Sequence, residues 1–503
     1  MRRTLAVVAG VVVVALVAVI AVVWLARGHP ADVEPTGESG PPGLSEFYTQ
    51  QVEWSECGAA SCAWVTVPVD YGEPTGETLR LRVVRYEATG DGGRSLLVNP
   101  GGPGGSAIAY AGQLASDLGD DVRKLYDVVG VDPRGVGKST PLTCLDDAAF
   151  DDYIDTPSPP DDDPDAAAES VLDSTAELGE ACEAGSGALA GHVSTEEAAR
   201  DMDVVRALLG RTHLDWFGAS YGTQLGATYA DLFPDAVGRM VLDGAIDPTL
   251  SSTEKNLGQA TGFQRALDAF LASCLDDDCP LGDDAGQITD DIADLLEHLD
   301  ATPLTVGDRE LTSARAFYGI AATLYSELTW PALTTSLTEA FQGHGQLLLR
   351  MSDIYLQRSS DGSYAGNLIQ ANVAVSCLDT GDDVTQQDIE AALPRFRRVS
   401  PVFGESLAWG SMGCDAWPTE RDHPQQPVSA KGAAPILVLG TTRDPATPYE
   451  WAQALAEQLE SGVLVTRDGD GHTAYTSGDH CITDAVDAYL ADGTVPEDGL
   501  TCR

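Results

Sequence analysis

The residue with the clearest chemical role is Ser220, which stands in the pattern Gly-x-Ser-x-Gly between Gly218 and Gly222. An apolar run from Leu214 leads into this pattern, and a helix-compatible run to Phe233 follows it. In such a strand-to-helix turn the serine adopts a strained backbone conformation, and only glycine-sized neighbours two positions away avoid collision. The pattern therefore predicts a nucleophile elbow with Ser220 as the nucleophile. The alternative is an ordinary serine in a tight surface turn.

An acid and a base follow Ser220 in the chain order that such a serine requires. Asp444 comes shortly after the apolar run 436–439, past the carboxyl end of an expected buried strand. His472 follows a second apolar run, 463–465, and lies in a loop rich in Gly and Asp. The imidazole would take the proton of the serine, and the carboxylate would orient the imidazole and stabilise its charged form. We expect these three residues to form a catalytic triad.

Each partner has an alternative interpretation. Asp444 could cap the helix that follows it instead of orienting a base. His480 is the only other histidine after Asp444. It is the less favoured base, because its neighbour Cys481 would tie it into a disulfide-bonded segment.

The turn after the apolar run 96–98 carries almost no side chains. It reads Asn-Pro-Gly-Gly-Pro-Gly-Gly-Ser over residues 99–106, which leaves its backbone amides accessible. Acyl transfer develops negative charge on an oxygen, and backbone N–H groups aimed at that oxygen typically contribute about 3 kcal/mol each. We expect an oxyanion hole formed by the N–H groups of Gly102 and Tyr221. A phosphate-binding loop is the alternative, but the expected lysine is missing and Pro103 would interrupt a helix start.

Short apolar runs bounded by turns predict the elements that would hold these residues. The expected buried strands are 96–98, 128–131, 240–242 and 436–439, with a half-exposed strand over 79–84. Helical segments such as 196–209 and 449–459 lie between them. This alternation predicts an α/β protein with a doubly wound, mostly parallel sheet. Ligands bind such sheets at the carboxyl ends of the strands.

The pattern changes between about residues 248 and 428 to helical periodicity, as in 263–275 and 288–299, with little strand character. We interpret this stretch as a helical cap inserted into the sheet domain. The expected organisation is an N-terminal segment (1–30), a flexible linker (31–43), the first part of the core (44–247), the cap (248–428) and the C-terminal part of the core (429–503).

The N-terminal segment begins with Arg2 and Arg3 and then runs uncharged from Thr4 to Ala26. This run is about long enough to cross a bilayer as a helix. We favour an uncleaved membrane anchor over a cleaved signal peptide, because the run leads directly to Arg27 rather than ending at small residues. In either case the remaining chain would face the outside of the cell, and membrane contact would be confined to this segment.

The ten cysteines all lie beyond the apolar segment, which fits export and disulfide formation. Proximity along the chain groups them, although spacing does not determine connectivity. The groups are Cys57/Cys62, Cys144/Cys182, Cys274/Cys279, Cys377/Cys414 and Cys481/Cys502. Zinc binding is the competing interpretation, but the sequence lacks the paired Cys-x-x-Cys spacing of metal knuckles. We expect no metal ion and no other cofactor.

Acidic residues outnumber basic residues 78 to 29, which gives a formal net charge of −49. Such a charge repels phosphate backbones and anionic lipid headgroups, so nucleic acid is not an expected partner. We interpret the acidity as a soluble, self-repelling surface. The alternative is that it attracts cationic substrates.

Several stretches together resemble the secreted actinobacterial tripeptidyl aminopeptidases, relatives of the prolyl aminopeptidases within the α/β-hydrolases. The likeness covers most of the chain. It is carried by Val-Pro-Val-Asp-Tyr at 67–71, the glycine turn at 99–106, Asp-Pro-Arg-Gly-Val-Gly-Lys-Ser at 132–139, the elbow, Val-Leu-Asp-Gly at 241–244, and the loops of Asp444 and His472. The resemblance implies a cap over the site and a serine peptidase that releases short peptides from free amino termini. Mycobacterial envelope proteins described as serine proteases or carboxylesterases are also similar.

Recognition of a free amino terminus requires carboxylates in the pocket, because a buried cation without a partner is costly. The candidates are Asp247, after the strand that follows the elbow, and Asp379, within the expected cap. Either could instead be a plain helix cap or surface residue. A carboxylesterase acting on envelope or small-molecule esters is the alternative function, and an apolar pocket without such a carboxylate would favour it. A binding protein without catalysis would lack a triad member, and all three residues are present.

Overall fold

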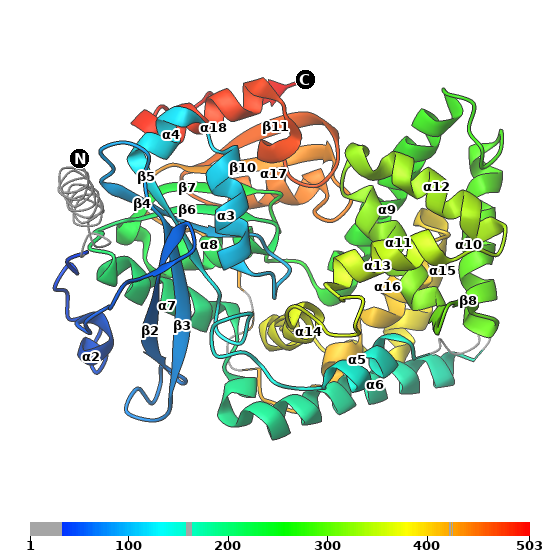
Figure 1. Cartoon of the computed structure of the whole chain (residues 1–503), viewed down its shortest axis with the longest axis horizontal. Helices are drawn as coiled ribbons and strands as arrows, with labels where there is room; N and C mark the ends of the chain where they lie inside the picture. The colour runs from blue at the N-terminus through cyan, green and yellow to red at the C-terminus, as the bar shows by residue number, and fades with distance from the viewer. Residues whose placement is uncertain (1–32, 157–162, 422–423, 425) are drawn as a thin grey trace, which may run out of the picture.

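The computed structural model describes residues 33–156, 163–421, 424 and 426–503, and within them a ten-stranded sheet forms the centre of one half of the molecule (Figure 1). The strand order is β1-β2-β3-β5-β4-β6-β7-β10-β11-β12. The pairs from β1 to β5 are antiparallel, and all strands from β5 onward in that order run parallel. The expected α/β class with a mostly parallel sheet is confirmed. The strands are β1 (Ser55–Cys57), β2 (Ala60–Pro68), β3 (Thr78–Tyr86), β4 (Arg94–Asn99), β5 (Tyr126–Val131), β6 (Leu214–Ala219), β7 (Val237–Asp243), β10 (Ile436–Arg443), β11 (Gly462–Asp470) and β12 (Leu500–Cys502).

Helices cover both faces of the sheet because successive strand residues point to opposite faces and both sets are apolar. In β10, Leu437 and Leu439 pack in the cluster of α3, α4 and α18, whereas Ile436 and Val438 pack in the cluster of α7, α8 and α17. The four apolar runs predicted to be buried strands are confirmed as parts of β4, β5, β7 and β10. The helices of this half are α2 (Ser45–Tyr48), α3 (Ala107–Asp117), α4 (Asp120–Leu125), α7 (Thr195–Leu208), α8 (Tyr221–Leu232), α17 (Tyr449–Gln458) and α18 (His480–Asp492).

A helical layer lies beside the sheet, on the right in Figure 1, and has apolar clusters of its own. The helical segments expected at 263–275 and 288–299 lie in α9 and α10. The elements of this layer after the elbow are α9 (Ser252–Leu275), α10 (Ala285–Ala301), the hairpin β8 (Leu304–Val306) and β9 (Arg309–Leu311), α11 (Ser313–Leu324), α12 (Trp330–Phe341), α13 (Gln346–Leu356), α14 (Leu368–Asp379), α15 (Gln386–Val399) and α16 (Gly404–Gly410).

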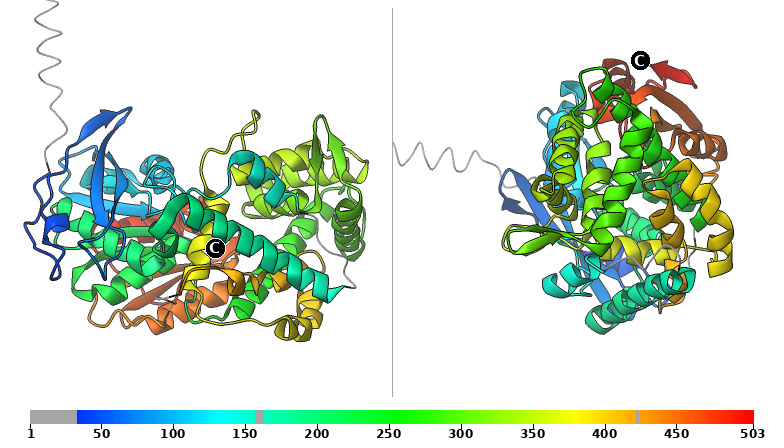
Figure 2. Two further views of the ribbon diagram at one scale, coloured as in Figure 1. Left: turned by 90° about the horizontal axis from the view of Figure 1, so that it is seen from below. Right: turned by 90° about the vertical axis from the view of Figure 1, so that its right-hand side faces the viewer.

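Two further helices, α5 (Asp147–Ile154) and α6 (Pro164–Ser186), join this layer from the part of the chain that we assigned to the core. Ala167 and Ala168 of α6 pack with Ile389 and Phe396 of α15. Helix α6 extends along the molecule from the sheet to the helical layer in both Figure 1 and the left view of Figure 2. The helical layer therefore contains residues on both sides of the elbow in the sequence.

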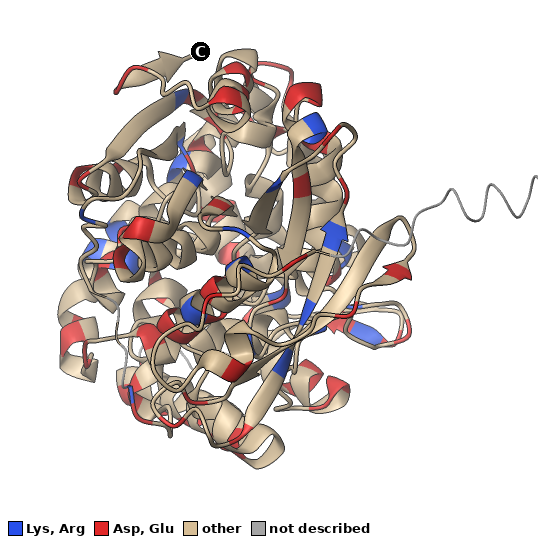
Figure 3. Cartoon of the chain, turned by 90° about the vertical axis from the view of Figure 1, so that its left-hand side faces the viewer, with Lys and Arg blue, Asp and Glu red and all other residues tan. Residues whose placement is uncertain are grey.

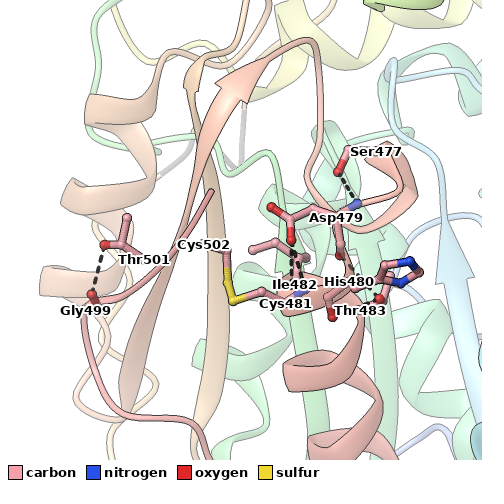
Figure 4. The surroundings of a disulfide bond; sticks show 9 residues. All are labelled: Ser477, Asp479, His480, Cys481, Ile482, Thr483, Gly499, Thr501 and Cys502. Carbon is pink, nitrogen blue, oxygen red and sulfur yellow. Dashed lines mark hydrogen bonds between the residues drawn. A yellow bond between two sulfur atoms is a disulfide. The ribbon is translucent and has the colours of Figure 1, made fainter.

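The disulfide bonds join the cysteines that the sequence analysis grouped by proximity, so that pairing is confirmed. Cys481 at the start of α18 is bonded to Cys502 of β12 and holds the last strand of the sheet in place (Figure 4). Five such bonds indicate an extracellular protein. The N-terminal segment 1–30, interpreted as an anchor or signal peptide, lies outside the described residues. In the described ranges, no helix has the length and apolar character needed to span a membrane.

Acidic residues are scattered over the loops and helices of the face drawn in Figure 3 rather than gathered in one patch.

The basic residue that is buried most deeply in the sheet domain is Arg134, in the loop 132–139 after β5. Its guanidinium donates to both carboxylate oxygens of Asp201 on α7, each at 2.8 Å, and to the carbonyl oxygens of Pro68 and Val69. Arg134 thus clamps this loop to α7 and to the end of β2.

Replacement Arg134→Met tests this clamp. The variant leaves the Asp201 carboxylate buried without its cation, so we expect the free energy of unfolding to fall by about 3–5 kcal/mol. Guanidinium denaturation measures the change. Arg80→Met is the matched control, because Arg80 is exposed on β3 over the ring of Trp64 and such a contact contributes about 1 kcal/mol or less. Equal losses in the two variants would contradict the assignment.

Candidate active site

Ser220 lies between β6 and α8 with a positive backbone φ of 54°, the strained conformation expected of a nucleophile elbow. A Cβ at Gly218 would lie 2.1 Å from the carbonyl oxygen of Gly222, and a Cβ at Gly222 would lie 2.5 Å from the carbonyl oxygen of Asn99. Both glycines are therefore required by sterics. The backbone N–H of Ser220 donates to the carbonyl of Asp243 at the end of β7, over 2.9 Å.

Asp444 and His472 come together after the ends of β10 and β11, and Asp243 joins the histidine loop to the elbow by accepting the N–H groups of Ser220 and Ala474. His472 Nδ1 lies 2.9 Å from Asp444 Oδ1 and 3.0 Å from Oδ2. The Asp444 side chain is fully buried and also accepts the N–H groups of Ala446, Thr447 and Thr473. Four donors thus fix this carboxylate, which in turn fixes the tautomer in which Nε2 of the imidazole carries a lone pair.

Two residues to which the sequence analysis assigned no role hold the histidine loop in place. Asp243 accepts the N–H groups of Ala474 and Tyr475, at 2.7 and 2.9 Å. Tyr325 of the helical layer accepts the backbone N–H of His472 with its carbonyl oxygen at 2.8 Å, and its ring meets the imidazole edge to face at 5.1 Å. Asp243 belongs to the stretch 241–244, which is one of those that carry the family resemblance. No local sequence pattern marks Tyr325.

The charges around His472 determine its protonation. Burial alone would lower the pKa of the imidazole, but the charge of Asp444, its hydrogen bond and the charge of Asp243 outweigh burial and raise that pKa. Burial raises the pKa of Asp243 to about 6, although the two N–H groups that it accepts oppose the shift. The imidazolium that forms when His472 takes a proton is therefore stabilised by two carboxylates.

The glycine turn 99–106 packs directly against the elbow. A Cβ at Gly101 would lie 2.7 Å from Ser220 Cβ and 2.8 Å from the backbone nitrogen of Tyr221. Gly102, Ser220 and Tyr221 line the same cavity. Within the described ranges, neither the N–H of Gly102 nor that of Tyr221 has a hydrogen-bond acceptor. Two unpaired N–H donors beside a strained serine are the arrangement that an oxyanion hole needs.

The cavity over the elbow has a volume of about 1180 Å³ and lies between the sheet and the helical layer. Aromatic side chains from the helical layer form one wall near His472: Phe263, Phe317, Tyr318, Tyr325 and Tyr355. Both candidate amine ligands, Asp247 and Asp379, line this cavity. A residue that the sequence analysis did not single out, Lys255, lines it too.

Asp247 and Asp379 differ in their hydrogen bonds. Asp379 is buried, and its two oxygens accept the backbone N–H and the hydroxyl of Thr195 and the amide of Gln224. Thr195 in turn is bonded to the hydroxyl of Tyr221 at 2.6 Å. Asp247 Oδ1 accepts three donors, from Thr249 and Gln458, whereas Oδ2 has no donor among the described residues.

The described residues also contain two groups of atoms with the spacing of metal ligands, and neither lines the cavity. In one group Cys481 and Cys502 are joined in a disulfide, which removes their thiolates as ligands. In the other, Glu197 is already bonded to His192 and lies 3.4 Å from the guanidinium of Arg134. His480 is exposed at the start of α18, beside the disulfide (Figure 4).

The substitution Asp444→Asn tests the electrostatics of the histidine. It removes the largest interaction that raises the pKa of His472, so the imidazole should titrate at lower pH than in the parent chain. Proton NMR titration of the histidine signals measures this pKa, with the His472 signal identified by its loss in His472→Gln. Asp468→Asn changes an exposed carboxylate near the end of β11 and is the control. An unchanged titration in Asp444→Asn would refute the account.

Comparison with known proteins agrees with this geometry. Residues 94–283 match the family described as alpha/beta hydrolase fold, and residues 400–502 match the family described as TAP-like protein. The chain is 36% identical over 475 residues to "Serine protease Hip1" of Mycobacterium tuberculosis, covering 90% of this chain and 91% of that protein. It is 38% identical over 489 residues to "Carboxylesterase B" of the same organism, covering 93% of each.

A third relative is "Tripeptidyl aminopeptidase" of Streptomyces lividans, 32% identical over 470 residues, with 90% of this chain and 86% of that protein covered. These relatives are described by different activities, so they identify the class of enzyme rather than the substrate. The chain belongs to the TAP-like family of α/β-hydrolases and is a serine hydrolase, a protease or an esterase.

Proposed function

We propose that the chain is an extracellular serine exopeptidase that releases short peptides, notably tripeptides, from free amino termini. The observation that carries the proposal is the acidic lining of the cavity over Ser220. Its charged residues are Asp247, Glu254, Asp294, Glu297, Asp300, Asp379, Asp382 and Glu405, against the single base Lys255 in the described part of the lining. A cavity with this balance favours a cationic group such as a terminal ammonium.

In the proposed mechanism, His472 takes the proton from Ser220 as the serine oxygen attacks the carbonyl carbon of the substrate. The N–H groups of Gly102 and Tyr221 stabilise the oxyanion, and His472 then protonates the leaving amine. Water attacks the acyl-enzyme with His472 again as the base. Asp444 keeps the imidazole oriented throughout both steps.

Asp247 is the stronger candidate for the ammonium ligand. Its Oδ1 is held by three donors, which orients the carboxylate, and its Oδ2 is left for a further donor. Both oxygens of Asp379 are already used by Thr195 and Gln224. We therefore assign Asp379 a positioning role: through Thr195 it holds Tyr221, one of the two oxyanion donors.

An esterase is the second candidate function, and the aromatic wall beside His472 favours it. Phe263, Phe317 and Tyr325 would accept an apolar acyl or alcohol group as readily as a peptide side chain. The acidic lining distinguishes the two functions, because a neutral ester gains nothing from it.

Three chromogenic or fluorogenic substrates test the proposal directly: a tripeptide amide with a free amino terminus, its acetylated twin and a short-chain nitrophenyl ester. We expect the free peptide to be cleaved with the highest kcat/KM and Ser220→Ala to abolish turnover of every substrate while the fold is retained. Residual turnover by Ser220→Ala at the parent rate would refute the nucleophile. Cleavage of the ester alone would establish the esterase.

The variant Asp247→Asn tests the ammonium ligand. Loss of the charged acceptor should lower kcat/KM for the free peptide relative to its acetylated twin by about 10-fold to 100-fold, since hydrogen bonds to charged groups contribute about 1.5–3 kcal/mol. Asp294→Asn, which removes an exposed carboxylate at the rim of the same cavity, is the matched control. If the two variants change the ratio equally, Asp247 is not the ligand.

A further inference from the structure

Lys255 is placed in the cavity by the first turn of α9. A capping box between Ser251 and Glu254 fixes this turn, and Ser252 is bonded to the carboxylate of Asp382. Lys255 follows directly, is partly buried, and lines the cavity that contains Ser220. The start of the helix therefore holds a cation in a cavity whose other charged residues, among those that the structure describes, are carboxylates.

The ammonium group of Lys255 has no hydrogen-bond or ion-pair partner in the part of the chain that the structure describes. The charge that acts on it is that of Asp379, whose oxygens are already engaged by Thr195 and Gln224. Burial lowers the pKa of Lys255, and Asp379 opposes this shift. Lys138 and Lys431, by contrast, are exposed to water. A partly desolvated ammonium without a direct partner is costly, and an anionic ligand would relieve that cost.

The position of Lys255 relative to the nucleophile follows from its neighbours. Asp379 is bonded to Gln224, which lies one turn of α8, about 6 Å, beyond Ser220. At the other end of the cavity, Phe263 packs on Tyr325, and the ring of Tyr325 contacts the imidazole of His472. Lys255 and Phe263 are eight residues apart on α9, or about 12 Å along the helix. Lys255 thus lies on the elbow side of the cavity, away from the wall beside His472.

We propose that Lys255 is a specificity residue that binds a carboxylate on the acyl part of the substrate, such as a glutamate or aspartate side chain of the released peptide. The inference rests on the proposed function, because it takes the substrate to be a peptide. The leaving amine must lie near His472, which protonates it, so a residue on the elbow side meets the acyl part. Three extended residues span about 10 Å, so a tripeptidyl group bound to Ser220 extends well into the cavity that Lys255 also lines.

The chemistry of the cavity makes this role specific. An acidic side chain that enters the cavity meets repulsion from the carboxylates of the lining, and Lys255 is the one base among the described lining residues. A direct contact with Lys255 acts on one position of the peptide. A general effect of its charge acts on all positions alike, and a purely structural role acts on acidic and neutral substrates alike.

The test compares kcat/KM for three pairs of tripeptide aminomethylcoumarin substrates, with Glu or Gln at the first, second or third residue. We expect Lys255→Met to lower the Glu-to-Gln ratio about tenfold at one position, because a hydrogen bond to a charged group is lost. Lys255→Arg, which keeps the charge, should retain the ratio. Lys431→Met, at an exposed lysine, is the matched control and should match the parent chain.

Two results would overturn the inference: a ratio that Lys255→Met leaves unchanged at every position, or one that it lowers equally at all three. Calorimetric titration of the corresponding tripeptide amides into Ser220→Ala, with and without Lys255→Met, gives the same ratio as Kd values without turnover. This second measurement reports on Lys255 even if the chain hydrolyses none of the peptides. Failure to hydrolyse any of them would refute the proposed exopeptidase, but it would not refute the binding of a carboxylate by Lys255. Thermal unfolding of each variant, compared with the parent chain, shows whether a change in either ratio comes from loss of the fold.

Discussion

The positive φ of Ser220 is the constraint on which the rest of the site depends. A non-glycine residue in such a conformation costs roughly 1–3 kcal/mol and persists only where its surroundings enforce it. Two features stabilise this conformation of Ser220. Gly218 and Gly222 leave space for the turn, and the backbone N–H of Ser220 donates to the carbonyl oxygen of Asp243. Because α8 begins at the next residue, Tyr221 lines the cavity, and its N–H has no acceptor among the described residues.

Residues of one type take different roles in this site according to how their hydrogen bonds are arranged. Asp444 accepts three backbone N–H groups and is bonded to His472, and Asp379 is bonded to Thr195, which is in turn bonded to Tyr221. Asp247 keeps one oxygen without a donor among the described residues. The composition shows only that the chain is acidic, whereas these contacts show which carboxylates have both oxygens engaged and which has one oxygen without a donor.

Much of the fold and of the site could be predicted because the signals are local. Buried parallel strands leave unbroken apolar runs, as at 436–439, and the elbow and the glycine turn leave glycines that sterics require. The disulfides were predictable as neighbours in the chain. The support of the histidine loop was not, because Tyr325 meets His472 only through tertiary packing. The same holds for α6, whose apolar face packs on helices more than two hundred residues later in the sequence, such as α15.

The hydrogen bond from His472 to the carbonyl of Tyr325 has a consequence for how such enzymes could be built or changed. The helical layer supplies part of the scaffold of His472, so the sheet domain by itself does not hold this residue completely. A shortened enzyme made of the sheet domain alone would keep Ser220 and Asp444 but would lose an anchor of its histidine. Substitution or grafting of helical layers between relatives therefore has to preserve the backbone position at residue 325, whatever side chains the new layer carries.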